Sequence, residues 1–192
     1  MNKLSLSEKQ DAIKAIDNSI RDLSELLDIY INKLKDFEII SNDHKKNEKV
    51  IKDFKVYILV IAGQIDANIC FKNVLSYNCM YEGLFFRNIG FMKMQECVKK
   101  LLNLTKDSNN GEIQKNLNEW NDRYLEKLNK IRINSGAHYD LDMYKFYEIG
   151  FEKNDAFFNS DVFTDFFLLL RSIFDLLDSE FTLVQKNTDY SL

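Results

Sequence analysis

The chain has 192 residues, 45% of them hydrophobic and 13% aromatic, which is enough for one buried core and too apolar for a disordered protein. It contains no proline and six glycines, so the residues that most strongly interrupt helices are scarce, and a single all-α domain over residues 1–192 is predicted. A formal net charge of −4 argues against a protein that coats nucleic acid non-specifically, but it allows one local basic site.

The first predicted helix occupies residues 1–45 and starts at Ser5 or Ser7, because a serine followed by Glu8 and an apolar pattern is typical of a helix N-terminus. Its apolar residues recur in alternating steps of three and four: Ile13, Ile16, Ile20, Leu23, Leu27, Tyr30, Leu34 and Phe37. This spacing indicates a seam against a nearly parallel neighbour, and we expect a long N-terminal helical hairpin. An intermolecular coiled coil is the alternative, although the flanking positions show no clear charge code.

A polar joint at 41–49 is expected to lead into a second helix at about 50–80, which is apolar on nearly all sides at its centre, as in a helix enclosed by others. Its polar residues Gln64, Asp66 and Asn68 are expected to hydrogen-bond neighbouring helices or to face outward at one edge. Three further helices are predicted from near Tyr81, from Glu112 to Ser135, and from Ser160 or Asp161. The predicted architecture is therefore a five-helix bundle.

The cysteines Cys70, Cys79 and Cys97 are odd in number, lie in apolar helical patterns and lack the short spacing of metal ligands. They are expected to be reduced core thiols in a cytoplasmic protein. The N-terminus lacks the apolar stretch of a signal peptide, and no membrane span is expected. Neither a metal site nor a cofactor is expected, because the two histidines are far apart and no glycine-rich phosphate loop occurs.

The segment KIRINSGAHYD, residues 130–140, places an arginine and a histidine at the end of the fourth predicted helix. On a helical wheel, Arg132 falls at the edge of an arc of core positions formed by Leu117, Tyr124, Leu128 and Ile131. A guanidinium beside the core needs an anionic partner, from the protein or from a ligand. Gly136 allows the chain to turn back and bring His138 against the last helical turn. There the helix dipole favours imidazolium and Arg132 opposes it, so we expect the pKa of His138 to suit proton transfer.

These residues resemble the signature of the HEPN superfamily, in which an arginine is separated from a histidine by four to six residues. The stretch RINSGAHYD is most similar to the abortive-infection-like branch, in which a helix reading like EKLNKIR is followed by a short polar link and AHYD. By pattern, the resemblance covers roughly residues 50–180. It implies a helical bundle that forms a homodimer with its two Arg–His motifs facing each other. It also implies, in active members, a metal-independent endoribonuclease of toxin or phage-defence type, and in some a nucleotidyltransferase-type partner or antitoxin.

The chemistry of RNA cleavage gives each residue of the motif an expected role. Arg132 suits the charge of the phosphorane because its guanidinium is a planar fork, and His138 from each of two copies would supply the base and the acid. Asn134 is a candidate for holding a phosphate oxygen, and Tyr139 or Asp140 for positioning the imidazole.

Four further cations are candidates for substrate binding: Arg87, Arg123, Lys127 and Lys130. The last three recur on one face of the fourth helix, but the interspersed Asp122 and Glu126 also suit a solvated face. Arg87, like Arg171, is set among apolar residues, which is typical of buried or edge ion pairs.

The alternative to an enzyme is a non-catalytic module that binds nucleotide, RNA or a protein partner. In that case Arg132 and His138 would bind only helix-end carbonyls or Asp140. Substituting His138 separates the two interpretations, because only an enzyme would lose RNA cleavage.

Overall fold

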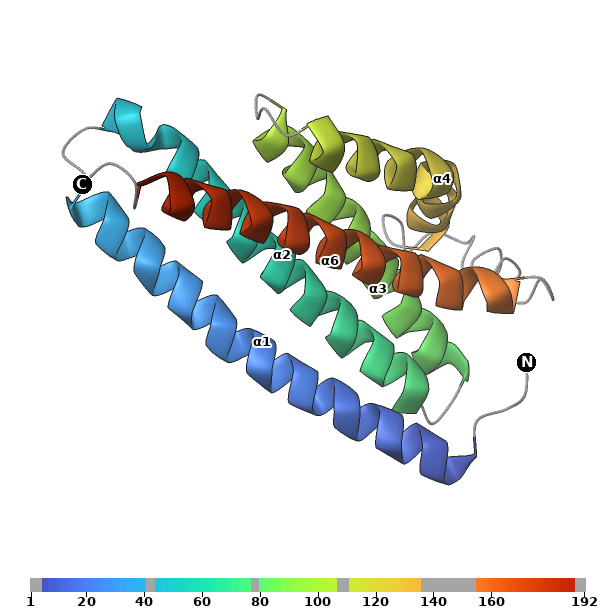
Figure 1. The fold of residues 1–192 in the computed structure, drawn as a ribbon. Helices are drawn as coiled ribbons and strands as arrows, with labels where there is room; N and C mark the ends of the chain where they lie inside the picture. Colours follow the sequence, from blue (N-terminus) through green and yellow to red (C-terminus); the bar gives the residue numbers. More distant parts are fainter. Residues whose placement is uncertain (1–4, 41–43, 77–79, 107–110, 136–154, 189–192) are drawn as a thin grey trace.

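The computed structural model describes residues 5–40, 44–76, 80–106, 111–135 and 155–188, and Figure 1 shows how they are arranged. These residues form α1 (Leu6–Ile40), α2 (His44–Ser76), α3 (Met80–Thr105), α4 (Gly111–Ser135) and α6 (Asp155–Thr188), with no strand among them. The predicted all-α, five-helix bundle is therefore confirmed.

α1 and α2 form the long N-terminal hairpin that the periodicity predicts, with α1 on the outside of the bundle (Figure 1). Ser5 caps α1, because its hydroxyl accepts the Glu8 N–H at 3.2 Å and its own N–H donates to the Glu8 carboxylate at 2.7 Å. All the predicted seam residues of α1 are half-buried. One of them, Tyr30, stacks on Tyr57 of α2 with ring centroids 4.8 Å apart. The seam thus packs against a helix of the same chain.

α2 lies at the centre of the bundle, with α1, α3 and α6 against it. Two glycines allow these helices to approach closely. A Cβ on Gly63 would lie 2.6 Å from the Cys97 Sγ of α3, and a Cβ on Gly90 would lie 2.7 Å from the Phe163 ring of α6. Among the described helices, three lie against α2, and none of them covers its remaining side. Ile69, on the remaining side, is 42% exposed.

α6 crosses α2, α3 and α4 (Figure 1), and its buried residues share one face: Val162, Phe163, Phe166, Leu169, Leu170, Ile173 and Leu177. They pack into a common core with buried side chains of α2, α3 and α4. Cys70 and Cys97 are buried and free, as expected for reduced core thiols, whereas Cys79 lies outside the described residues.

Two helices begin earlier than predicted. α2 starts at His44 rather than near residue 50, and α6 starts at Asp155 rather than at Ser160 or Asp161. The α2 start was placed after the polar stretch 41–49, but a polar stretch without glycine or proline does not by itself interrupt a helix. The α6 start was placed at the candidate cap residues Ser160 and Asp161, which both lie inside α6.

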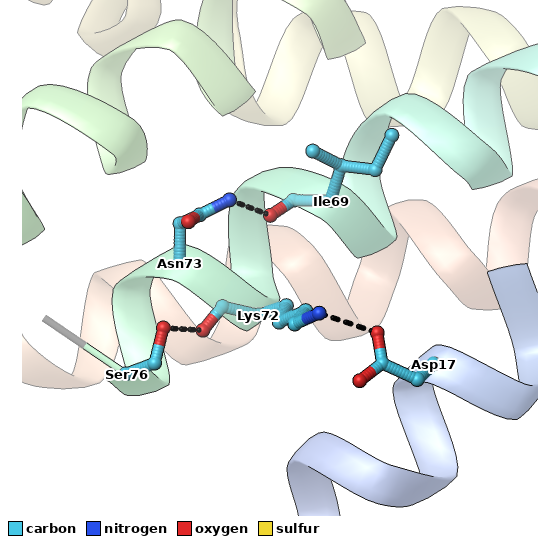
Figure 2. A network of polar contacts seen from close by, with 5 residues as sticks. All are labelled: Asp17, Ile69, Lys72, Asn73 and Ser76. Atoms are coloured by element: carbon cyan, nitrogen blue, oxygen red, sulfur yellow. Dashed lines mark hydrogen bonds and ion pairs between the residues drawn. The ribbon is translucent and has the colours of Figure 1, made fainter.

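Two of the three polar residues singled out in α2, Asn68 and Asp66, make the expected contacts with neighbouring helices. Asn68 donates to the Ser19 hydroxyl of α1 at 3.5 Å, and the Asp66 carboxylate lies 3.5 Å from the Lys93 ammonium of α3. Figure 2 shows Lys72 of α2 reaching Asp17 of α1. Residues 47–76 are long and apolar enough in composition to span a membrane. Core helices of bundles share that composition, and α2 packs against three other helices.

Candidate functional site

The Arg–His motif begins at the C-terminal end of α4. Arg132 and Asn134 belong to the end of this helix, and the description covers their backbone only, as it does for Lys130. His138, Tyr139 and Asp140 lie outside the described residues.

One part-buried hydrogen bond links this end of α4 to α3. Gln95 of α3, which is 3% exposed, donates from Nε2 to the Asn129 Oδ1 of α4 at 2.8 Å. Nearer the start of α4, Gln114 donates to the Leu102 carbonyl of α3 at 3.1 Å. α3 and α4 therefore run in opposite directions, and Arg132 lies about one turn beyond Asn129 along α4.

Two adjacent polar residues are buried in the N-terminal half of α3. Arg87 and Asn88 are each 5% exposed, and the Arg87 Nε donates to the Asn88 Oδ1 at 3.2 Å. The guanidinium also lies 5.8 Å from the centroid of the Phe91 ring, within the range of a cation–π contact. Because α3 and α4 are antiparallel, Arg87 and Asn88 lie on the same side of the Gln95–Asn129 bond as Arg132.

The Asn88 amide has an unused donor. Its Nδ2 is buried and has no hydrogen-bond partner among the described residues. Leaving such a buried donor unsatisfied costs about 1–3 kcal/mol, so an acceptor in this region would be stabilising.

Arg123 joins α4 to α6. Its guanidinium lies 2.7 Å from the Asp165 carboxylate of α6, and the Tyr124 hydroxyl donates to the same carboxylate at 2.5 Å. Burial and this hydrogen bond raise the pKa of Tyr124 to about 12. A phosphate at Arg123 would have to compete with Asp165. Of the other candidate cations on α4, Lys127 is exposed, and the side chain of Lys130 is outside the description.

A shallow hollow of about 190 Å³ lies beside this ion pair, between α4 and α6. Its lining is mostly polar on the α4 side and partly apolar on the α6 side: Asn116, Glu119, Trp120, Arg123, Asp165, Leu168, Leu169 and Ser172. The indole N–H of Trp120 is buried without a partner among the described residues. No group of three or more His, Cys, Asp or Glu side chains suited to a metal ion occurs in the described part of the chain.

Sequence reasoning missed Asn88, Gln95 and Trp120. A signal for the first two was present, because Asn88 and Gln95 are seven residues apart and alternate with buried apolar positions of α3 such as Phe91 and Val98. Polar side chains at core positions of a helical repeat are expected to be paired or functional. Nothing in the sequence around Trp120 distinguishes an indole with an unused donor from an ordinary core tryptophan.

A scan against protein-family models and searches of curated proteins and of solved structures found no match. The fold class therefore rests on the helices described above, and any function rests on this chain's own residues. The candidate site consists of the end of α4 and the buried polar side chains of α3 toward the same end.

Proposed function

We propose that the chain is a HEPN-like, metal-independent endoribonuclease, of the toxin or phage-defence type, in which Arg132 and His138 form the active site. The observation that carries the proposal is the Gln95–Asn129 hydrogen bond, which links the end of α4 to the buried Gln95 of α3 at 2.8 Å. Arg132 would then project from a helix whose position is fixed, as transition-state stabilisation requires. The buried Arg87 and the Asn88 Nδ2, which has no partner among the described residues, lie toward the same end.

The proposed reaction moves one proton at each end of the cleaved bond. One His138 removes the proton of the RNA 2′-hydroxyl, and the 2′ oxygen attacks the adjacent phosphorus. The bond from phosphorus to the 5′ oxygen breaks, and a second, protonated His138 donates its proton to that oxygen. Arg132 stabilises the extra negative charge on the phosphorane. Because each chain has one His138, the proposal includes a two-fold homodimer with the two motifs at its interface.

The test is RNA cleavage by the purified protein in the presence of EDTA. Single-stranded RNA should be cut to leave 2′,3′-cyclic phosphate ends, because attack by the 2′ oxygen makes that product. Arg132→Ala and His138→Ala should each lower the rate by a factor on the order of 10² or more. Arg171→Ala is the matched control, because Arg171 is exposed and lies 4.0 Å from Asp175 on α6. If wild-type and His138→Ala proteins cleave RNA equally, or neither cleaves a panel of RNAs, the enzyme proposal fails.

A non-catalytic binding module is the second candidate. It is favoured by the charge pattern on the described part of α4, where Arg123 is ion-paired with Asp165 and the exposed Asp122 and Glu126 lie nearby. Such a mixed surface is a poor track for an RNA backbone and suits a protein partner, for which a nucleotidyltransferase-type antitoxin is our candidate. If this candidate is correct, binding of that partner should survive changes that abolish any cleavage.

A further inference from the structure

The hollow between α4 and α6 is built from matching positions of the two helices. Each helix contributes one set of residues at the same spacing: Asn116, Glu119, Trp120 and Arg123 from α4, and Asp165, Leu168, Leu169 and Ser172 from α6. Residues at this spacing share one face of a helix. The hollow, of about 190 Å³, is smaller than the roughly 300–1,000 Å³ of a pocket for a drug-sized ligand, so it suits one small ring.

One wall of the hollow contains a hydrogen-bond donor that the described residues leave unused. Trp120 is 5% exposed, and its indole N–H is buried without a partner among them. Because an unsatisfied buried donor is costly, a ligand that brings an acceptor to the indole should be bound favourably. The acceptor can reach the indole when a lining side chain shifts. Leu168, which is 59% exposed, can shift at little cost, because exposed side chains change rotamer readily.

Carboxylate acceptors lie in the same hollow. The Asp165 Oδ2 accepts from both the Arg123 guanidinium and the Tyr124 hydroxyl, whereas its Oδ1 accepts from no donor in the part of the chain that the structure describes. The Glu119 side chain is 63% exposed, and its partner Lys115 is 3.9 Å away. Such an exposed, distant pair contributes little, so both oxygens of Glu119 can accept hydrogen bonds from a ligand.

These groups select a ligand by its pattern of donors and acceptors. Two carboxylates, Glu119 and Asp165, outnumber the one guanidinium of Arg123, which disfavours a phosphate or a carboxylate in the hollow. A neutral ring with one acceptor beside two donors fits instead. Guanine has such an edge, because O6 accepts while N1–H and the N2 amino group donate side by side, as bidentate pairing with a carboxylate requires. Adenine, cytosine and uracil lack the two adjacent donors.

We propose that the α4–α6 hollow binds a guanine base. Glu119 accepts from N1–H and from the N2 amino group, and Trp120 donates to O6. The Arg123 guanidinium, which Asp165 holds at 2.7 Å, offers a flat face on which the ring can stack. Because the hollow is shallow, the ribose and phosphate extend into solvent, and the base can belong to a free nucleotide or to single-stranded RNA. The inference does not depend on RNA cleavage, because it uses none of the motif residues.

The test uses the single tryptophan of the chain, whose indole N–H gives one resonance in a nitrogen–proton NMR spectrum. Guanosine should move this resonance downfield, because the indole N–H gains an acceptor. Inosine differs from guanosine only in lacking the 2-amino group, so it leaves Glu119 with one donor fewer. The affinity for guanosine should therefore exceed that for inosine at least about tenfold.

Glu119→Gln should weaken guanosine binding at least about tenfold and remove the preference over inosine, because the amide cannot accept from both donors. Asp122→Asn is the matched control. It also removes one carboxylate from an exposed position of α4, but Asp122 does not line the hollow, so the affinity should not change. Circular dichroism should show both variants folded, since both side chains are exposed.

Three results would each overturn the proposal. They are an indole resonance that guanosine does not move, equal affinities for guanosine and inosine, and guanosine binding that Glu119→Gln leaves unchanged. If guanosine fails in this way while the protein still cleaves RNA, this inference is wrong and the proposed function stands. If guanosine binds as expected and no RNA is cleaved, the proposed function is wrong and the guanine site stands.

Two further ligands separate the two sources of the base. One is guanosine 5′-monophosphate, and the other is a 2′-O-methyl uridine oligomer with one guanine, which cannot react through its 2′ oxygen. If the oligomer binds at least about tenfold more tightly than the mononucleotide, and replacing its guanine by hypoxanthine removes the gain, the base comes from RNA. Tighter binding of the mononucleotide assigns the hollow to a free guanine nucleotide.

Discussion

The hydrogen bond between Gln95 and Asn129 should contribute to the free energy of unfolding. We expect removal of the acceptor to cost more than removal of the donor, because the two residues differ in exposure. Asn129→Leu removes the acceptor and leaves the Gln95 amide, 3% exposed, without a partner. An unsatisfied buried donor costs about 1–3 kcal/mol, and burial this complete favours the upper end. Gln95→Met leaves Asn129 unpaired instead, but Asn129 is half-buried and can turn toward water. Gln95→Met should therefore cost about 1 kcal/mol, the lower end of that range.

The double variant Gln95→Met/Asn129→Leu should cost less than the two single changes together. Replacing both partners by apolar side chains of similar shape removes the unsatisfied group as well as the bond. The coupling free energy should therefore be about 1–2 kcal/mol, as is typical of residues in direct contact. Urea unfolding of the four proteins measures it, and thermal unfolding should shift by about 2–4 °C per kcal/mol for a chain of this size.

Additive costs would refute the reasoning, because they would mean that the two side chains do not share a bond in solution. Equal costs for the two single variants would refute the asymmetry, which follows from the different exposure of the two residues. Gln114→Met is the matched control near the other end of the α3–α4 contact. Gln114 is half-buried, and its bonds to Leu102 and Thr105 do not involve Gln95 or Asn129, so it should show no coupling with Asn129→Leu.

Three further predictions concern the core and its titratable groups. Gly90→Ala should destabilise the protein by about 1–3 kcal/mol, because the added Cβ would lie 2.7 Å from the Phe163 ring. This cost should exceed the gain from the better helix propensity of alanine. Urea unfolding measures it, and unchanged stability would contradict the close approach. In a Cys79→Ser variant, a thiol reagent at about pH 8 should react with Cys70 and Cys97 only when the protein unfolds. Burial raises the pKa of Cys70 to about 11 and that of Cys97 to about 12, so both stay protonated in the native protein. Rapid reaction of the native protein would contradict this. The free energy of unfolding should fall as the pH rises from 10 toward 12. In this range unfolded Tyr124 ionises near its ordinary pKa of 10.0, whereas the pKa of folded Tyr124 is about 12. Tyr124→Phe should reduce the dependence of the unfolding free energy on pH.

Helical periodicity was a reliable guide wherever one side of a helix packs. Every seam position predicted for α1 is half-buried, because a helix on the outside of a bundle needs only one apolar stripe. α2 shows where this signal ends. Its centre is apolar on nearly all sides, so the pattern could not indicate that no other described helix covers the side carrying Ala62 and Ile69. That distinction depends on which helices are long enough and correctly placed to cover it.

The two arginines set in apolar stretches show the same limit. Arg87 and Arg171 have similar neighbours in the sequence, yet Arg87 is 5% exposed and the side chain of Arg171 is 78% exposed. A charged residue in an apolar stretch lies toward the core or toward solvent according to its angle on the helix, which neighbouring residues alone do not fix. The Arg–His motif was visible from sequence, but the Gln95–Asn129 bond beside it joins residues 34 positions apart and needed the fold.

The Gln95–Asn129 bond also allows a prediction for the proposed reaction. Arg132 lies about one turn beyond Asn129 along α4, so a change that displaces this turn should displace its guanidinium. Gln95→Met should therefore lower the kcat of RNA cleavage while circular dichroism shows that the protein stays folded. If the folded variant cleaves RNA as fast as the wild-type protein, the bond does not position Arg132 for the reaction.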